Sequence, residues 1–256
     1  MLAEERQKVI CEMVNKKKAV RVSDLSKQLN ITEATVRRDL DELQNEKKLR
    51  RTHGGAVALY PAGNEYVISE LAVENIEEKR RIAQKAYEFI DDYDALMFDG
   101  SSTVLELSRA LAAGQRKGII VVTNALSVAS VLAVKKDISV IQIGGEVRYH
   151  INSTVGKIAE RTLRDMRVDK TFIGINGIDV EFGYSITNFD EAAVKKEMLY
   201  NAKQSFVLAD SSKFGKSFLA KVAEPEGQID YVITDVKNED YDYDRMEETV
   251  HMVYAD

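Results

Sequence analysis

Small and hydroxyl-bearing residues follow a short apolar stretch near the middle of the chain. The cluster is Asp99-Gly100-Ser101-Ser102-Thr103, and it stands directly before a stretch with helical spacing. Glycine lets the backbone approach a ligand, hydroxyl groups donate hydrogen bonds, and a helix N-terminus offers unpaired N–H groups at the positive end of its dipole. These residue types in this order favour the binding of a phosphate group.

Three similar clusters follow later apolar stretches. They are Thr123-Asn124, Gly144-Gly145-Glu146-Val147-Arg148 and Asp210-Ser211-Ser212-Lys213. If the apolar stretches are parallel strands, their carboxyl ends meet at one edge of a sheet, which is where ligands collect. Taken singly, a Ser-Ser-Thr run is also a helix cap and Gly-Gly is also a turn. Four such clusters at equivalent positions indicate a pocket.

A second group of residues could read DNA. The segment from Thr32 to Lys47 has helical spacing and carries Thr35, Arg37 and Arg38 away from its apolar stripe. In a helix lying in the major groove, residues of the first turns touch base edges while flanking basic groups hold phosphates. Thr35 and Arg38 are therefore the predicted base-reading residues, although Arg38 could instead pair with Glu42 four residues later.

The flanking elements of the first 57 residues predict a winged helix-turn-helix. The first helix is expected over residues 2–18. The second is expected to begin at an N-cap formed by Ser23, with Val22 before it as a hydrophobic staple, and to end at Asn30. The third is expected to begin at an N-cap formed by Thr32 and to end at about Lys47. Val36, Leu40 and Leu43 form the buried stripe of the third helix. The basic strand 49–57, interrupted by Gly54 and Gly55, is expected to form the wing. Asp39 is expected to order Arg37 or a neighbouring helix.

The remaining chain predicts an α/β domain with a mainly parallel sheet. Residues 58–74 have the composition of a linker, which divides the chain into domains 1–57 and 75–256. Beyond the linker, short apolar strands alternate with amphipathic helices. Strands are expected at 95–98, 119–122, 139–143, 171–175, 205–209 and 231–233, and helices at 76–90, 104–112, 125–134, 155–165 and 190–202.

Composition excludes several protein classes. With 45% apolar and 30% charged residues, the 256-residue chain is neither disordered nor collagenous, and its length suits about two domains. The apolar segment 118–134 is broken by polar residues, so we expect no membrane span. Glu4, Glu5, Arg6 and Lys8 occupy the place where the apolar run of a signal peptide would lie, so we expect a cytoplasmic location. One cysteine and three histidines predict no metal site.

Charge is unevenly distributed along the chain. Residues 1–56 carry 13 Lys+Arg against 9 Asp+Glu, a net charge of +4, while residues 57–256 carry 23 against 33, a net charge of −10. A basic module attached to an acidic body is typical of a protein that binds the phosphate backbone of nucleic acid through one domain.

The paired motifs Thr35-Val36-Arg37-Arg38-Asp39-Leu40 and Arg51-Thr52-His53-Gly54-Gly55-Ala56 closely resemble the N-terminal signature of DeoR-type bacterial transcriptional regulators. The later segments resemble the C-terminal sensor domain of the same family, which is similar to the fold of ribose-5-phosphate isomerase. The resemblance covers about residues 1–235. It implies a repressor of a carbohydrate-utilisation operon, controlled by a phosphorylated sugar and without a cofactor.

Together, the residues and the resemblance define two expected sites. The expected DNA contacts are Thr32, Thr35, Arg37, Arg38, Lys48, Arg50, Arg51 and His53. The expected effector pocket contains Asp99, Gly100, Ser101, Ser102, Thr103, Thr123, Asn124, Gly144, Gly145, Arg148 and Lys213. The stretch from Asn188 to Lys195 is also similar to the family, with Phe189 where a proline is common. Because one helix-turn-helix reads few base pairs, double-stranded operator DNA requires a homo-oligomer, a dimer or a tetramer.

Two alternatives remain at this point. A sugar-phosphate isomerase-like enzyme fused to a DNA-binding head would need a carboxylate as general base, yet Asn176 stands where pentose-phosphate isomerases have an acidic cluster. Asp99 with Lys213 could still form a catalytic pair, although we expect no catalytic residues. The helix-turn-helix could also bind another protein instead of DNA, but the arginines on its exposed face disfavour this alternative.

Overall fold

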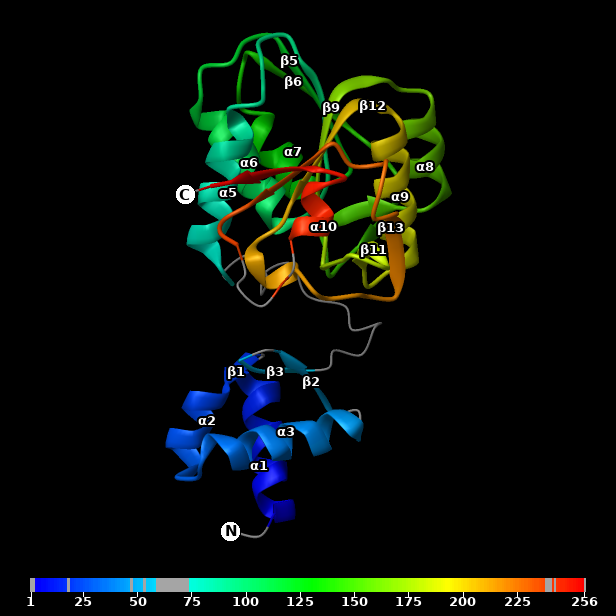
Figure 1. Ribbon diagram of the computed structural model, residues 1–256. Helices are drawn as coiled ribbons and strands as arrows, with labels where there is room; N and C mark the ends of the chain where they lie inside the picture. Colours follow the sequence, from blue (N-terminus) through cyan, green and yellow to red (C-terminus); the bar gives the residue numbers. More distant parts are fainter. Residues whose placement is uncertain are drawn as a thin grey trace. The chain divides into compact units, whose positions relative to one another are not determined.

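The computed structural model describes residues 3–17, 19–46, 48–52, 54–58, 74–237, 241 and 243–255. The chain forms two compact units, Met1–Pro61 and Ala62–Asp256, which are described separately (Figure 1). Residues 59–73 of the expected linker lie outside the described residues. The domain limits at residues 57 and 75 therefore stay predictions.

Three helices begin and end in the first unit largely where local signals place them. They are α1 (Ala3–Lys17), α2 (Val22–Leu29) and α3 (Glu33–Asn45). The Thr32 side chain accepts a hydrogen bond from the Thr35 N–H group at 3.2 Å, which confirms the predicted cap of α3. Asn30 ends α2 in the left-handed conformation (φ 51°), a geometry that asparagine tolerates well, so the predicted turn is also confirmed.

The predicted cap of α2 is wrong. The helix begins at Val22, after Arg21, without a side-chain cap from Ser23. Val22 is buried, and its N–H group donates to the Gly54 carbonyl at 2.9 Å. A contact between residues 32 positions apart therefore decides where α2 starts, and local capping preference does not.

The wing is part of a three-stranded antiparallel sheet with the order β1-β3-β2. Its strands are β1 (Ala19–Arg21), β2 (Leu49–Thr52) and β3 (Gly55–Ala58). Strand β1 was not predicted, because three residues carry too little pattern. A Cβ atom on Gly55 would lie 1.9 Å from the Val20 carbonyl oxygen, so only glycine allows this pairing. The predicted stripe of Val36, Leu40 and Leu43 is buried in the core of this unit.

A parallel sheet forms the centre of the second unit, as predicted. Its described strands have the order β15-β14-β12-β9-β4-β5-β6, and all neighbouring pairs are parallel. Their bounds are β4 (Ala95–Phe98), β5 (Ile119–Thr123), β6 (Ile138–Gln142), β9 (Val168–Gly174), β12 (Ala202–Leu208), β14 (Tyr231–Thr234) and β15 (His251–Tyr254). The chain builds outward from β4 to β6 and then returns to the other side of β4, where β9 lies.

Helices cover both faces of this sheet (Figure 1). One face packs against α5 (Ile76–Tyr87), α6 (Ser102–Ala113) and α7 (Leu126–Leu132), and the other against α8 (Lys157–Arg164) and α9 (Phe189–Tyr200). Alternation along β4 explains the two layers, because Leu96 and Phe98 face the first group and Met97 faces the second.

Smaller elements complete the second unit, and none of them was predicted. A hairpin of β7 (Glu146–Arg148) and β8 (Ser153–Val155) precedes α8, so the expected helix 155–165 starts two residues late. A second antiparallel sheet has the order β10-β11-β13, with bounds β10 (Gly177–Asp179), β11 (Gly183–Ile186) and β13 (Ala220–Ala223). The short helices are a 3-10 turn (Ser211–Lys213) and α10 (Asp244–Glu247). None of the described helices is long and apolar enough to span a bilayer.

Candidate functional site

A pocket opens at the carboxyl ends of β4 and β9, where the order of strands along the chain reverses. Such switch points are where open α/β sheets bind ligands. The empty space in and around its open mouth is about 870 Å³, bulk solvent included. Its polar lining residues are Lys79, Asp99, Ser101, Ser102, Thr103, Asn124, Ser153, Asn176, Thr187, Glu191, Lys195 and Lys213.

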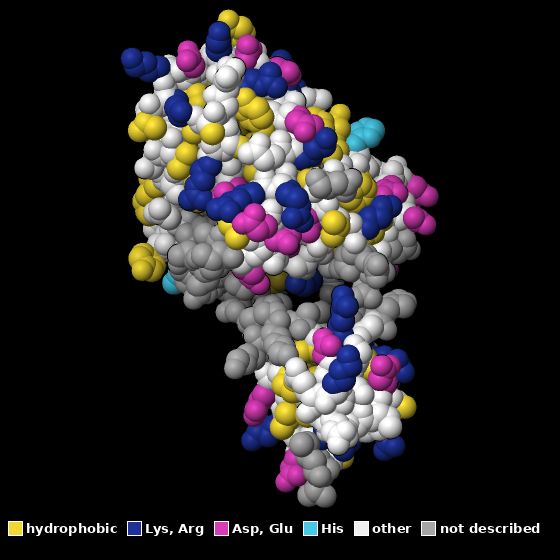
Figure 2. Space-filling model, turned by 90° about the vertical axis from the view of Figure 1, so that its left-hand side faces the viewer, with side chains coloured by type: hydrophobic (Ala, Val, Ile, Leu, Met, Phe, Trp, Pro, Cys, Tyr) yellow, Lys and Arg dark blue, Asp and Glu magenta, His cyan; other side chains and the backbone are white. Residues whose placement is uncertain are grey.

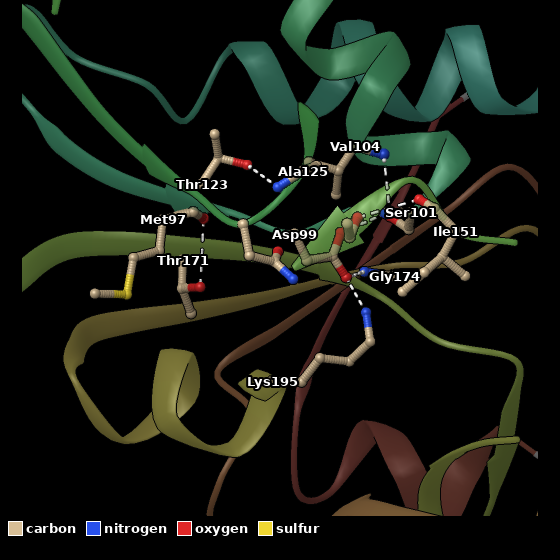
Figure 3. A network of polar contacts seen from close by, with 12 residues as sticks. Met97, Asp99, Ser101, Val104, Thr123, Ala125, Ile151, Thr171, Gly174 and Lys195 are labelled. Atoms are coloured by element: carbon tan, nitrogen blue, oxygen red, sulfur yellow. Dashed lines mark hydrogen bonds and ion pairs between the residues drawn. The ribbon is translucent and has the colours of Figure 1, made fainter. Parts of the chain in front are cut away.

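Asp99 lies at the base of this pocket and connects three segments through its carboxylate (Figure 3). Its buried carboxylate accepts hydrogen bonds from the Ser101 N–H group at 2.9 Å and the Gly174 N–H group at 2.8 Å, and it pairs with the Lys195 ammonium. The carboxylate thereby joins the ends of β4 and β9 to α9. The sequence suggested that Asp99 could form a catalytic pair with Lys213. This pairing is wrong, because the lysine that pairs with the Asp99 carboxylate is Lys195.

The N-terminus of α6 forms one wall of the pocket. The Ser101 hydroxyl caps the helix by accepting from the Val104 N–H group at 3.3 Å, while Ser102 and Thr103 occupy the first helical positions. Both lie largely buried and line the pocket. The first N–H groups of a helix have no partner within the helix, so this wall can donate hydrogen bonds to an anion.

Two lysines bring positive charge to the same pocket. Lys79 on α5 is only 2% exposed and donates to the Glu74 carbonyl at 2.6 Å. Burial, and then repulsion from Lys213, lowers the pKa of Lys79 below its ordinary value. Two neighbouring ammonium groups that destabilise each other would both gain from a bound anion.

Asp210 partly balances this charge. Lys213 Nζ lies 3.8 Å from an Asp210 carboxylate oxygen. Burial acts to raise the pKa of Asp210, but the charge of Lys213 and the hydrogen bonds from Ser212 outweigh it, so the pKa lies below its ordinary value. Asp210 therefore stays ionised and holds Lys213 at the pocket edge.

The positive charge of the pocket is local. On the face of this unit that carries α5, basic and acidic side chains are interspersed (Figure 2). Arg80 pairs with Glu77 and Lys85 pairs with Glu88, both at 2.7 Å. Among the described residues this outer face carries no broad basic area, so an anionic ligand would be attracted mainly by the buried lysines and the helix N-terminus.

The structure brings together most but not all of the predicted pocket residues. Those that line the pocket are Asp99, Gly100, Ser101, Ser102, Thr103, Asn124 and Lys213. Those that do not are Thr123, Gly144, Gly145 and Arg148. The Thr123 hydroxyl accepts from the Ala125 N–H group at 3.0 Å, and Arg148 lies 3.9 Å from Asp190 at the start of α9. Ser153 of the β7–β8 hairpin lines the pocket instead.

Several lining residues were missed from the sequence. Lys79 had a readable signal, because it stands three, four and seven residues before Ile82, Ala83 and Ala86 on the apolar face of a helix. A lysine on the apolar face of a helix is expected to be buried, and buried lysines nearly always have a partner that compensates their charge. Ser153 had no comparable signal, since its approach depends on how the hairpin packs.

The surface of α3 carries the predicted DNA-reading residues. Arg38 is well exposed, and its Nε lies 3.3 Å from Glu42, so the pairing considered from the sequence is present. Arg37 pairs with Glu33 at 2.7 Å. Exposed pairs of this kind contribute at most about 1 kcal/mol, so both arginines can exchange their partner for DNA.

The remaining basic residues near α3 have varied surroundings. Arg51 pairs with Asp41 at 2.5 Å, and Lys48 pairs with Glu46 at 2.6 Å. The backbone of Arg50 lies in β2, whereas its side chain and the whole of His53 fall outside the described residues. Thr32 is occupied as the cap of α3, with its hydroxyl 2.9 Å from that of Thr35.

Comparisons with known proteins cover both units. The DeoR-like helix-turn-helix domain family matches residues 6–61, and the DeoR C terminal sensor domain family matches residues 74–236. A solved structure of D-ribose-5-phosphate isomerase in complex with phospho-erythronic acid is similar with a TM-score of 0.41 and 20% identity, over 54% of each chain.

Two relatives align along almost the whole chain. The HTH-type transcriptional regulator YulB of Bacillus subtilis (strain 168) is 37% identical, covering 92% of this chain and 90% of that protein. The lactose phosphotransferase system repressor of Streptococcus mutans serotype c is 32% identical, covering 94% of this chain and 95% of that protein. Both are named as regulators and neither as an enzyme. The chain therefore belongs to the DeoR family of helix-turn-helix transcriptional regulators.

Proposed function

We propose that this protein represses a carbohydrate-utilisation operon and that a phosphorylated sugar controls its affinity for operator DNA. The observation that carries the proposal is the convergence of Lys79, Lys213 and the N-terminus of α6 on one pocket. The repressor name of a relative that aligns along nearly the full chain supports the same conclusion.

The chemistry of the pocket suits a phosphate monoester. Asp99 is neutralised by Lys195, so its charge does not oppose an anion. Ser102 and Thr103 supply hydroxyl and N–H donors, Ser101 supplies a hydroxyl donor, and Lys79 and Lys213 supply charge. Charge-assisted hydrogen bonds contribute roughly 1.5 to 3 kcal/mol each, and a phosphate dianion accepts several.

The DNA-binding role falls to the first unit. Thr35 and Arg38 would read base edges, while Arg37, Lys48, Arg50, Arg51 and His53 would hold phosphates or reach the adjacent minor groove. Thr32 would position Thr35 through the cap. Residues 1–57 would then act as the reading domain and 75–256 as the sensing and oligomerising domain, in a cytoplasmic homo-oligomer that binds repeated half-sites.

The isomerase-like enzyme is the weaker candidate. The Asp99 carboxylate is occupied by three donors, and Asn176 at the end of β9 cannot take a proton. Incubation of the protein with ribose 5-phosphate, followed by an assay for ribulose 5-phosphate, should therefore show no conversion above that of a blank.

Calorimetry and DNA binding test the proposal together. A thermal-shift screen can identify the phosphorylated sugar, because a ligand at a hundred times its Kd adds roughly 2.7 kcal/mol of stability. Calorimetry should then show that this sugar phosphate binds. Its unphosphorylated parent should bind at least tenfold more weakly. Lys213→Ala should abolish the effect of the sugar phosphate on operator affinity while leaving affinity without it nearly unchanged.

The surface variant Lys203→Ala serves as the matched control, since Lys203 pairs with Asp169 away from the pocket lining. It should respond to the sugar phosphate like the unaltered protein. Equal affinity for the phosphorylated and unphosphorylated sugar would contradict the proposal, as would a normal response of Lys213→Ala.

A further inference from the structure

Asn124 is held in one orientation at the end of β5. Its side-chain Nδ2 donates to the Thr154 carbonyl at 2.8 Å, and its backbone carbonyl accepts from the Thr154 N–H group at 2.8 Å. A carbonyl oxygen can only accept a hydrogen bond, so the amide nitrogen must face Thr154. The side-chain oxygen, Oδ1, must then face away from Thr154.

That oxygen has no hydrogen-bond partner among the residues that the structure describes. Asn124 is 5% exposed, and Oδ1 itself is buried, so bulk water does not solvate it freely. Buried polar atoms are nearly always paired in native proteins, and an unpaired one destabilises the fold. An orphaned acceptor on a residue that lines a ligand pocket indicates a donor supplied by the ligand.

The place of Asn124 relative to the phosphate-binding wall is defined by the sheet. Phe98 on β4 pairs with Thr123 on β5, so Asp99 and Asn124 are the next residues along two adjacent strands. Gly100 packs against Ser153 and Ala125, the neighbour of Asn124. Asn124 therefore lines the same pocket as the N-terminus of α6, one strand away.

We propose that Asn124 Oδ1 accepts a hydrogen bond from a hydroxyl group of the sugar and thereby selects the hydroxylated ligand, an inference that rests on the proposed function. The oxygen cannot pair with the phosphate, because a phosphate dianion has no proton to donate and its oxygens repel another acceptor. Asn124 thus orients the ligand, with the phosphate toward Lys79 and Lys213 and a hydroxyl toward β5.

Calorimetry on the full-length protein tests this role. The probes are inorganic phosphate and three sugar phosphates, namely ribose 5-phosphate, fructose 6-phosphate and glucose 6-phosphate, followed by the monodeoxy analogues of the tightest binder. One deoxy analogue should bind the unaltered protein about tenfold more weakly, the loss typical of one neutral hydrogen bond. Asn124→Leu should bind that analogue and its parent with equal affinity.

Inorganic phosphate separates this role from a purely structural one. Its affinity should be unchanged in Asn124→Leu and reduced in Lys79→Met, because only Lys79 is assigned to the phosphate. Lys203→Ala, which changes a residue outside the pocket lining, should keep the discrimination between parent and deoxy sugar.

Each contrary result has a distinct meaning. Undiminished binding of every deoxy analogue by the unaltered protein would overturn the role of Asn124, and this measurement does not depend on whether a variant folds. Equal losses for inorganic phosphate and sugar phosphate in Asn124→Leu would also overturn it. If the unaltered protein binds none of the sugar phosphates, the proposed function fails and this inference fails with it.

Discussion

Arg6 on α1 donates two hydrogen bonds to the buried carboxylate of Asp39 on α3, at 2.6 and 2.8 Å. The expectation that Asp39 orders a neighbouring helix is thus confirmed. The pair fixes the helix that carries Arg37 and Arg38 against the helix that supports it. An acidic residue in the middle of a DNA-reading motif is explained by this internal contact.

Asp39→Ala should therefore destabilise the first unit. The loss of a charge-assisted, largely buried interaction costs roughly 1.5 to 3 kcal/mol, and amide hydrogen exchange in α1 and α3 of the full-length protein would measure it. Asp41→Ala is the matched control, because Asp41 is more exposed and its pair with Arg51 contributes at most about 1 kcal/mol. Equal protection in the two variants would refute the anchoring role.

Gly100 allows the loop before α6 to pass close to the β7–β8 hairpin. A Cβ atom at this position would lie 2.0 Å from the Ser153 hydroxyl oxygen and 3.1 Å from its Cβ. Gly100→Ala should lower the free energy of unfolding by about 1 to 3 kcal/mol, as overpacking does. The double variant Gly100→Ala/Ser153→Ala should recover much of that loss in urea unfolding, whereas additive losses would rule out the predicted clash.

Arg38 should contribute to sequence recognition. Arg38→Ala is expected to cost roughly 1 to 3 kcal/mol on an operator selected from random duplexes, and much less on random DNA, when binding is measured by fluorescence anisotropy. Arg51→Ala should weaken binding to both DNAs alike and reduce the dependence on salt. Equal losses on both DNAs for Arg38→Ala would remove Arg38 from the base-reading role.

Asp210 should make stability depend on acidity. Its pKa is lower in the folded protein than in the unfolded chain, so its contribution is fully present above the ordinary value of 3.8 and is lost as the pH falls through the lower folded value. The unaltered protein should exceed Asp210→Asn in free energy of unfolding at pH 7. This difference should shrink progressively below about pH 4.

Urea unfolding at a series of pH values measures that difference directly. Other carboxylates such as Asp91 and Asp169, whose pKa values are also lowered by lysine partners, affect both proteins equally. A difference that stays constant from pH 7 to below pH 3 would show that Lys213 and Ser212 do not stabilise the ionised form of Asp210.

Much of the first unit could be predicted from the sequence, because its helices depend on residues that are close together along the chain. The spacing of Val36, Leu40 and Leu43 and the cap at Thr32 act within one helix, and Asn30 ends the preceding one by its own backbone preference. Such signals involve residues a few positions apart, so they survive in the linear sequence. The alternation of apolar strands and amphipathic helices identified the parallel sheet for the same reason.

Only the tertiary structure decided which side chains meet. The partner of Asp99 is Lys195, 96 residues later, and the start of α2 depends on a hydrogen bond from Val22 to Gly54. Arg148 follows a predicted strand like the other pocket residues, yet it stands beside Asp190 instead of lining the pocket. Periodicity predicts which face of an element is buried, but strand order and the packing of distant segments determine what that face contacts.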